Sequence, residues 1–387
     1  GLGDVYKRQG VFSSRQIERA TYESIPFRYI AGGWHPDHDT LATFRKTFLA
    51  QIADLFVQVL LVAKEADVLQ LGRISLDGSK VHADASKSKA VSYKRLLALE
   101  HLLQQEVAEL LALSAQAEAG VLPVNMDGQE ELLLRRTRLA NLAQAKKVLE
   151  VRAEERYQAE KAEYEAKIQA REEQRKPRGR KPEPPQQPGP RDKDQYNFTD
   201  PDSRMMKNST DKGLDQHEDV EGAVGQDSFL IVAHSLSNHP TDRNEALPTL
   251  DAIAPALGTP EAAALDTGYF NAPNIAGMEQ RGIDPYIATG RESHYKSWRM
   301  RFAELPDPPP PEARPIVKMA YKLRTEIGQA IYKLRKSTVE PVIGIIKEIM
   351  GFRQFSLRGL AAAAGEWGLV CLAFNLKRLH VLLAGQL

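Results

Sequence analysis

The feature that most constrains the fold of this chain is an abrupt change of composition within it. From Val91 to about Arg175 the sequence is rich in Leu, Ala, Glu, Gln, Lys and Arg, which favour helices. A break at Gly120–Gly128, which contains Pro123, divides this block into two arms. Apolar residues step by three and four along both arms, as in coiled coils, so we expect an antiparallel helical hairpin. The stepped positions are Leu96, Leu99, Leu103, Val107 and Leu110, then Leu139, Leu142 and Leu149.

The hairpin interrupts a series of strands and helices. Behind it, residues 176–190 contain six prolines and predict an extended linker. Without this insert the expected order is three strands, a helix, a strand, a helix, a strand and then helices, which matches a ribonuclease H-like α/β core. The expected strands are 73–85, 222–224, 229–233, 262–266 and 285–288, and the expected helices are 247–257, 271–281 and most of 316–387.

The segment before the first strand is predicted to be all-α. Apolar residues recur every four positions from Phe44 to Leu60, and Asp39 or Thr40 would cap that helix. Residues 1–9 resemble a translated adapter scar ahead of a truncated reading frame, and we exclude them from the fold. The predicted domains are therefore a helical domain at 10–72, a core at 73–90 and 191–387, and a hairpin with its linker at 91–190.

Bulk composition describes a globular protein without a strong overall charge. The chain has 387 residues, 27% of them charged, and a net charge of +1. Residues 291–358 nevertheless contain 14 Lys and Arg against 7 Asp and Glu, which favours a polyanionic partner or a solvated face. The single Cys371 excludes an internal disulfide and fits a reducing compartment. The best candidate for a membrane span, 360–376, is short and carries Glu366.

Three acids stand in positions that suggest chemistry. Asp77 and Asp266 each end an apolar run, and Glu340 lies in a basic helical segment with Lys347 seven residues further on. Two acids at strand ends and one on a helix can hold two divalent cations, the arrangement that many phosphodiester-cleaving enzymes use. We expect the three carboxyl groups to converge to within about 10 Å, close enough to share two ions.

Around these acids the chain resembles bacterial insertion-sequence transposases of the DDE type, the group with a Tyr…Arg…Glu…Lys signature. The resemblance extends over roughly 11–387. It departs from the usual signature at one point, because four residues separate Arg335 from Glu340 instead of three, so Lys336 holds the expected arginine position. The matching pieces are Leu76-Asp77-Gly78-Ser79-Lys80, Leu265-Asp266-Thr267-Gly268-Tyr269, Val339-Glu340-Pro341-Val342, Gly351-Phe352-Arg353 and Leu357-Arg358-Gly359.

The resemblance implies a metal-dependent enzyme that cuts DNA at element ends and joins the freed 3′ ends to target DNA. It implies two Mg²⁺ ions, for which Mn²⁺ can substitute, with Asp77 bridging both, Asp266 on one and Glu340 on the other. Contacts with the DNA backbone would come from Tyr332, Arg335 and Lys347. It further implies a homo-oligomer on DNA, no membrane partner, and a place in the bacterial cytoplasm with the nucleoid.

Each acid also has an ordinary structural explanation. Asp77 and Gly78 form a common hairpin-turn signal. Asp266 can cap the turn that follows it. Ser337 to Glu340 fits a capping box, and Pro341 favours a helix boundary there.

Other candidate residues and two other functions were also weighed. Asp84 is a nearby acid expected at the surface, and the leucine seam is expected to pack helices. The alternatives for the whole protein are a catalytically inactive transposase relic that only binds DNA, and a coiled-coil scaffold. The histidines show no metal-ligand spacing: His82, His217, His234, His239 and His294.

Overall fold

The computed structural model describes residues 13–116, 127–172, 181–208, 213–290 and 305–385. The chain divides into two compact units, one formed by residues 1–85 with 202–387 and the other by 86–201. The first is a mixed α/β unit and the second is mainly helical. Residues 1–12, including the segment compared with an adapter scar, lie outside the described residues. The domain boundaries predicted from sequence remain a prediction.

A six-stranded sheet forms the centre of the first unit. Its middle strand, β1, pairs antiparallel with β5 on one side and parallel with β7 on the other, and β8 continues the parallel side. The outer edge of β5 is shared by two strands, first β4 and then β6. The strands are β1 (Arg73–His82), β4 (Arg204–Lys207), β5 (Leu214–Gly225), β6 (Ile231–Ser237), β7 (Ala262–Leu265) and β8 (Asp284–Ile287).

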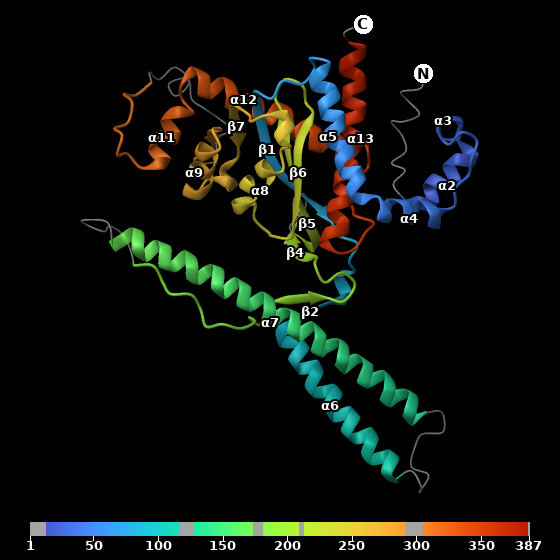
Figure 1. Ribbon diagram of the computed structural model, residues 1–387. Coiled ribbons are helices and arrows are strands. Elements are labelled where there is room, and N and C mark those ends of the chain that lie inside the picture. The colour runs from blue at the N-terminus through green and yellow to red at the C-terminus, as the bar shows by residue number, and fades with distance from the viewer. Residues whose placement is uncertain (1–12, 117–126, 173–180, 209–212, 291–304, 386–387) are drawn as a thin grey trace. The chain divides into compact units, whose positions relative to one another are not determined.

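Helices cover both faces of this sheet (Figure 1). On β1, Ser75, Asp77 and Ser79 alternate onto one face, where they contact α12 and the π-helical turn η6 that follows it. Helices α5 and α13 pack on that face as well, on either side of His234. Helices α8 and α9 cover the opposite face. The bounds are α5 (Leu49–Glu65), α8 (Ala246–Asp251), α9 (Ala272–Gln280), α11 (Pro315–Lys322), α12 (Glu326–Gly344), η6 (Ile345–Ile349) and α13 (Leu360–Ala384).

Helix α13 has the length and hydropathy of a membrane span, yet it packs into this core. Trp367, Cys371 and Phe374 are buried in the same apolar cluster as the strands. Its one acid, Glu366, is also buried and accepts hydrogen bonds from the backbone N–H groups of residues 356 and 357. These contacts explain a long apolar helix as part of the core.

The helical start of the chain differs from the single helix that was predicted between about 40 and 62. Helix α4 ends at Thr47 and α5 begins at Leu49, so Phe48 separates two helices that the four-residue stripe joins. The N-cap is Asp37, not Asp39 or Thr40, because its carboxylate accepts the N–H of Thr40 at 2.6 Å. The helices here are α2 (Ser14–Glu23), α3 (Ile25–Ile30) and α4 (His38–Thr47).

Three further predictions along the core need correction. The Asp77–Gly78 pair forms no turn, since β1 continues through it to His82. The helix expected over 247–257 stops at Asp251, and a separate 3₁₀ turn begins at Pro255, whose ring nitrogen has no proton to donate to a continuing helix. Strand β5 is much longer than the 222–224 strand predicted.

The second unit contains two long antiparallel helices. Leu96 and Leu103 of α6 pack against Leu142, Ala145 and Leu149 of α7. Ion pairs join Lys146 to Glu100 (3.0 Å) and Arg135 to Glu106 (2.7 Å). The helices are antiparallel, because the position further along α7 pairs with the position earlier in α6. The paired strands β2 and β3 lie at the base of the unit. The bounds are β2 (Ala90–Ser92), α6 (Tyr93–Gln116), α7 (Gly128–Glu172) and β3 (Gln195–Asn197).

Candidate active site

Asp77 and Asp266 lie at equivalent positions on neighbouring parallel strands. The register pairs Arg73 with Ala262 and Ser75 with Ala264, a constant offset of 189 residues. Continued two residues beyond the last of these pairs, the same offset would bring Asp266, the residue just after β7, beside Asp77 of β1. Neighbouring strands lie about 4.8 Å apart, so the register favours a position for Asp266 next to Asp77. One oxygen of Asp266 also caps the following 3₁₀ turn by accepting the N–H of Gly268 at 2.7 Å.

Glu340 lies inside α12, so the capping-box explanation for this acid is wrong. The helix begins at Glu326, where Thr325 accepts the N–H of Gly328, and it continues through Pro341 to Gly344. The glutamate side chain is 51% exposed. It is therefore available at the surface of the helix.

Arg335 joins two of the three acids. Its guanidinium donates to Asp77 Oδ2 at 2.9 Å and to Glu340 Oε1 at 3.3 Å. The arginine side chain is only 7% exposed. Burial opposes its charge, but Asp77, Asp266 and Glu340 outweigh that effect, and the pKa of Arg335 is raised. A buried cation therefore lies among the three acids.

The acids also act on one another. Burial raises the pKa of Asp77 to about 6, and the nearby charges of Asp266 and Glu340 push it in the same direction, whereas Arg335 lowers it. Acidic groups that raise each other's pKa are a usual feature of sites that bind cations or transfer protons.

In metal-free buffer we expect Asp77 to lower the stability of the protein as the pH rises from about 4 to about 6. Its pKa of about 6 in the folded protein exceeds the ordinary unfolded value of about 3.9. The folded state therefore binds the Asp77 proton more tightly, and the stability that this proton contributes is lost as the pH rises through the folded pKa. The loss would be about 3 kcal/mol. Urea unfolding of the wild type and Asp77→Asn across this range measures it, and parallel pH curves for the two proteins would contradict it.

Lys347 binds the same strand as Asp77. Its ammonium donates to Ser79 Oγ at 2.6 Å and to the carbonyl oxygen of Lys80 at 2.7 Å, and burial lowers its pKa. The turn that carries it is π-helical, so α-helical counting from Glu340 does not give its direction. Tyr332 is half-buried, with its ring centroid 5.9 Å from the Arg335 guanidinium.

A buried polar network holds α12 on the sheet, and sequence reasoning missed it. Thr338 Oγ1 donates to Ser75 Oγ at 2.8 Å, and Gln226 Nε2 donates to the same oxygen at 3.0 Å. Tyr269, which the quoted motif contained without a role, is fully buried and donates to Glu221 Oε2 at 2.6 Å. Single hydroxyl residues in apolar runs give no distinctive pattern, so only Tyr269 had a visible signal.

The remaining candidates lie elsewhere. Asp84 forms an ion pair with Arg358 at 2.8 Å. The rings of His82 and His217 are tilted against each other, with centroids 4.3 Å apart. His294 lies outside the described residues. Within the described part of the chain, the one group of acids and histidines close enough to share a metal ion consists of Asp219, Glu221 and Asp242.

Asp77, Asp266 and Glu340 do not lie within that spacing of one another in this structure, but their chemistry suits a divalent cation. Asp77, Asp266 and Glu340 offer carboxylate oxygens, the ligands that Mg²⁺ and Mn²⁺ prefer. The guanidinium of Arg335 between two of them shows that this position stabilises positive charge. The site is therefore chemically suited to a hard cation.

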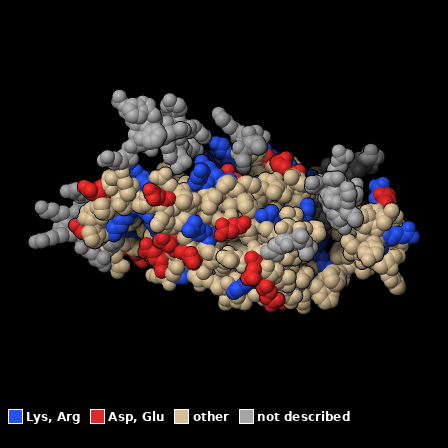
Figure 2. Space-filling model, turned by 90° about the horizontal axis from the view of Figure 1, so that it is seen from above, with Lys and Arg blue, Asp and Glu red and all other residues tan. Residues whose placement is uncertain are grey.

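The face seen in Figure 2 shows no single basic patch among the described residues. Lys and Arg are interspersed there with Asp and Glu among the described residues. A contact with a polyanion on this face would therefore use separate basic side chains.

Comparison with known families gives two matches. Residues 313–380 match the model of a transposase DDE domain, a range that includes Glu340 and Lys347. Residues 6–47 match a transposase domain of the DUF772 type. Neither a curated protein nor a solved structure matches the chain. Both matches are to transposase domains, which supports a function in DNA transposition. Together the two matches support an insertion-sequence transposase of the DDE type.

Proposed function

We propose that this protein cleaves DNA at the ends of its element and transfers the freed 3′ ends into target DNA, with Asp77, Asp266 and Glu340 as the catalytic acids. The observation that supports the proposal is that Arg335 donates hydrogen bonds to both Asp77 and Glu340. The register of β1 and β7, continued two residues beyond its last pair, would bring Asp266 beside Asp77.

The sheet supports a ribonuclease H-like core as part of this proposal. Apart from β4, which also pairs with β5, the strands of the sheet follow one another along the chain as β1, β5, β6, β7 and β8. In space their order is β6-β5-β1-β7-β8. The first three are antiparallel, and the last two are parallel to β1. The order of these strands along the chain agrees with the one expected once the hairpin is removed, whereas the spatial order was not predicted from the sequence.

The proposed cofactor is Mg²⁺, in two ions that Mn²⁺ can replace, held by Asp77, Asp266 and Glu340. Bound there, such ions activate the attacking oxygen and stabilise the leaving oxygen of a phosphodiester. The residues of the chain do the remaining work. Arg335 orients Asp77 and Glu340, Lys347 holds β1 through Ser79, and the Ser75–Thr338 hydrogen bond fixes α12 beside the strand.

The proposed partners are element-end DNA and target DNA, bound by a homo-oligomer in the bacterial cytoplasm. Tyr332, Arg335 and Lys347 remain the proposed contacts with the DNA backbone. Arg335 and Lys347 would first have to exchange their present protein partners for phosphate oxygens, whereas Tyr332 is half-buried and closer to the surface.

A strand-transfer assay tests the proposed function. Labelled DNA that carries the sequences flanking this gene is incubated with the protein, Mg²⁺ and a supercoiled plasmid. We expect nicking at the element ends and joining of label to plasmid, both abolished by EDTA. An inactive relic would shift the DNA in a gel without product. A scaffold built on the hairpin would bind no DNA after deletion of 86–201, whereas a transposase core would still bind it.

A further inference from the structure

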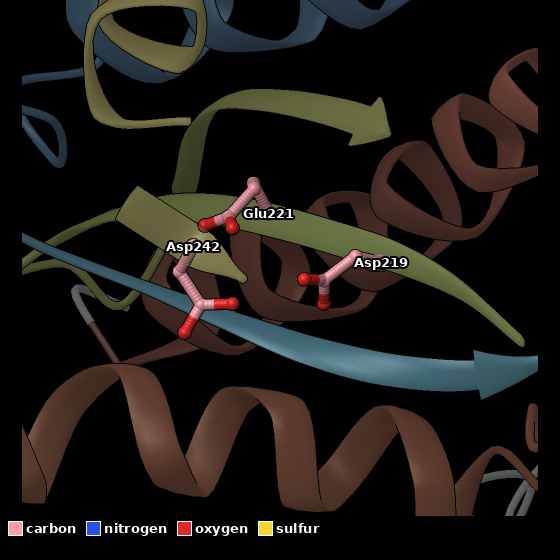
Figure 3. A group of neighbouring side chains, drawn as sticks. All are labelled: Asp219, Glu221 and Asp242. Atoms are coloured by element: carbon pink, nitrogen blue, oxygen red, sulfur yellow. The ribbon is translucent and has the colours of Figure 1, made fainter. Parts of the chain in front are cut away.

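A second group of acids lies on the opposite face of β1 from Asp77. Asp219 and Glu221 belong to β5, and Asp242 begins the short 3₁₀ turn η3 (Asp242–Asn244). One carboxylate oxygen from each lies within 4.8 Å of the others. Figure 3 shows the three side chains pointing toward one another. We call these three residues the β5 cluster.

The β5 cluster is buried and poorly partnered. Asp219 is 1% exposed and Glu221 is 0% exposed. Among the described residues, neither oxygen of Asp219 accepts a hydrogen bond from an N–H or hydroxyl donor, and neither does Glu221 Oε1; Asp219 instead lies against the carboxyl group of Asp242. A buried ionised carboxylate without a partner is strongly unfavourable, so these oxygens require protons or a cation. They point into the cluster, which identifies where that charge would sit.

The neighbouring charges do not neutralise the cluster. Lys80 pairs with Asp219 across β1 and β5, but no ion pair joins them, and the Lys347 ammonium is bonded to Ser79 and to the backbone of Lys80. Glu245 adds a fourth carboxylate nearby, and it contacts His239 Nδ1 at 2.7 Å. Burial, followed by the contact with Asp242, raises the pKa of Asp219 to about 8.

Two glycines make room for these carboxylates. Gly78 pairs with Glu221, and a Cβ atom at Gly78 would lie 2.5 Å from Glu221 Oε1. A Cβ atom at Gly268 would lie 3.0 Å from Asp266 Oδ1 and 3.4 Å from Asp242 Oδ2. The backbone is therefore shaped around the cluster, and Asp242 and Asp266 lie on either side of the same glycine.

We propose that Asp219, Glu221 and Asp242 bind one divalent cation, separate from the cations of Asp77, Asp266 and Glu340. Three carboxylates select a hard ion such as Mg²⁺, Mn²⁺ or Ca²⁺. Oxygens on opposite sides of a Ca²⁺ ion lie about 4.8 Å apart, and those on Mg²⁺ lie somewhat closer, so the span of the cluster suits one ion. The ion links β5 to η3 and supports the Gly268 turn beside Asp266. This proposal concerns cation binding and does not rest on DNA cleavage.

Mn²⁺ binding, measured by electron paramagnetic resonance of the free ion, tests the proposal. The full chain with Asp266→Asn and Glu340→Gln serves as background, because these changes remove two ligands of the other site. We expect it to bind one Mn²⁺ per chain and to melt at a higher temperature when Mn²⁺ is present. Adding Asp219→Asn and Glu221→Gln should weaken this binding by at least about tenfold and remove the shift in melting temperature.

The matched control is Asp227→Asn, an exposed carboxylate just beyond the end of β5, which should leave Mn²⁺ binding unchanged. If the cluster variant does not fold, Asp242→Asn on the less buried turn should give the same loss. A background protein that takes up no Mn²⁺ would overturn the proposal, because the acids would then share protons. Unchanged Mn²⁺ affinity in the folded cluster variants would also overturn it. Neither result bears on the proposed DNA reaction.

Discussion

Alanine at Asp77, Asp266 or Glu340, introduced one at a time, is expected to abolish cation-dependent cutting of DNA that carries the element ends. Each change removes a carboxylate from the proposed site. Loss of one group that stabilises transition-state charge typically costs about a hundredfold to a thousandfold in rate. DNA binding should survive, because contacts between basic side chains and phosphates supply most of the affinity. Cleavage and gel-shift assays on the same preparations separate the two effects.

Asp84→Ala provides the control for this series. Asp84 is an acid just past the end of β1, but it pairs with Arg358 at a partly exposed position, so its loss should change little. Cleavage that persists in the Asp266→Ala protein would place the reaction at other residues. Cleavage that persists in the Asp77→Ala protein would show that the position of Asp77 on β1 beside β7 has no catalytic role.

Gly328→Ala is expected to be the most damaging single change outside the acids. A Cβ atom at this position would overlap the carbonyl oxygen of Lys322, a backbone atom at the end of α11 that cannot rotate away. Relief of the overlap must displace the start of α12, the helix that carries Arg335 and Glu340. We expect a loss of about 3 kcal/mol and a fall in melting temperature of about 6 °C or more. Thermal unfolding measures both.

The same helix supplies the matched control for this prediction. Gly344 also lies in α12, and a Cβ atom there meets nothing within 4 Å. Because alanine favours helices more than glycine does, Gly344→Ala should leave stability unchanged or raise it by up to about 1 kcal/mol. Equal melting temperatures for the two variants would show that α11 and α12 do not cross closely at Gly328.

Sequence patterns succeeded where apolar residues dominate an element. The run 262–265 is buried at every position and was predicted as a strand, and the leucine seam of the hairpin packs as its spacing suggested. Asp266 could be found because it ends such a run. The three acids were predicted to share one site because the motifs around them occur in the order found in the family, whereas hydrophobic periodicity gave no such indication.

The pattern failed at β5, where buried positions are acidic. Residues 216–225 are all buried, yet Glu218, Asp219 and Glu221 interrupt any apolar alternation. Hydrophobic periodicity reads such a segment as a solvated loop. Contacts with distant parts of the chain make this segment a buried strand. Examples are the hydroxyl of Tyr269 and the space left by Gly78, both at Glu221.

Local signals also misled the prediction at single residues. Asp77-Gly78 has the composition of a turn, but Gly78 is needed because Glu221 occupies the space of its side chain. Ser337 to Glu340 has the spacing of a capping box, but the helix begins eleven residues earlier than Ser337, at Glu326. In the first case a long-range contact determines the structure, and in the second the cap at Thr325 begins the helix before the motif.

The two points at which the core chain is interrupted by the hairpin unit are held by one loop. Asp84 bonds to Arg358, and the carboxylate of Asp202 accepts the N–H of Leu360 at 3.2 Å. Both ends of the core chain at this break thus attach to residues 358–360. A direct connection between them would cost entropy that grows only slowly with its length. Removal of 86–201 would therefore leave the order of the strands along the core unchanged.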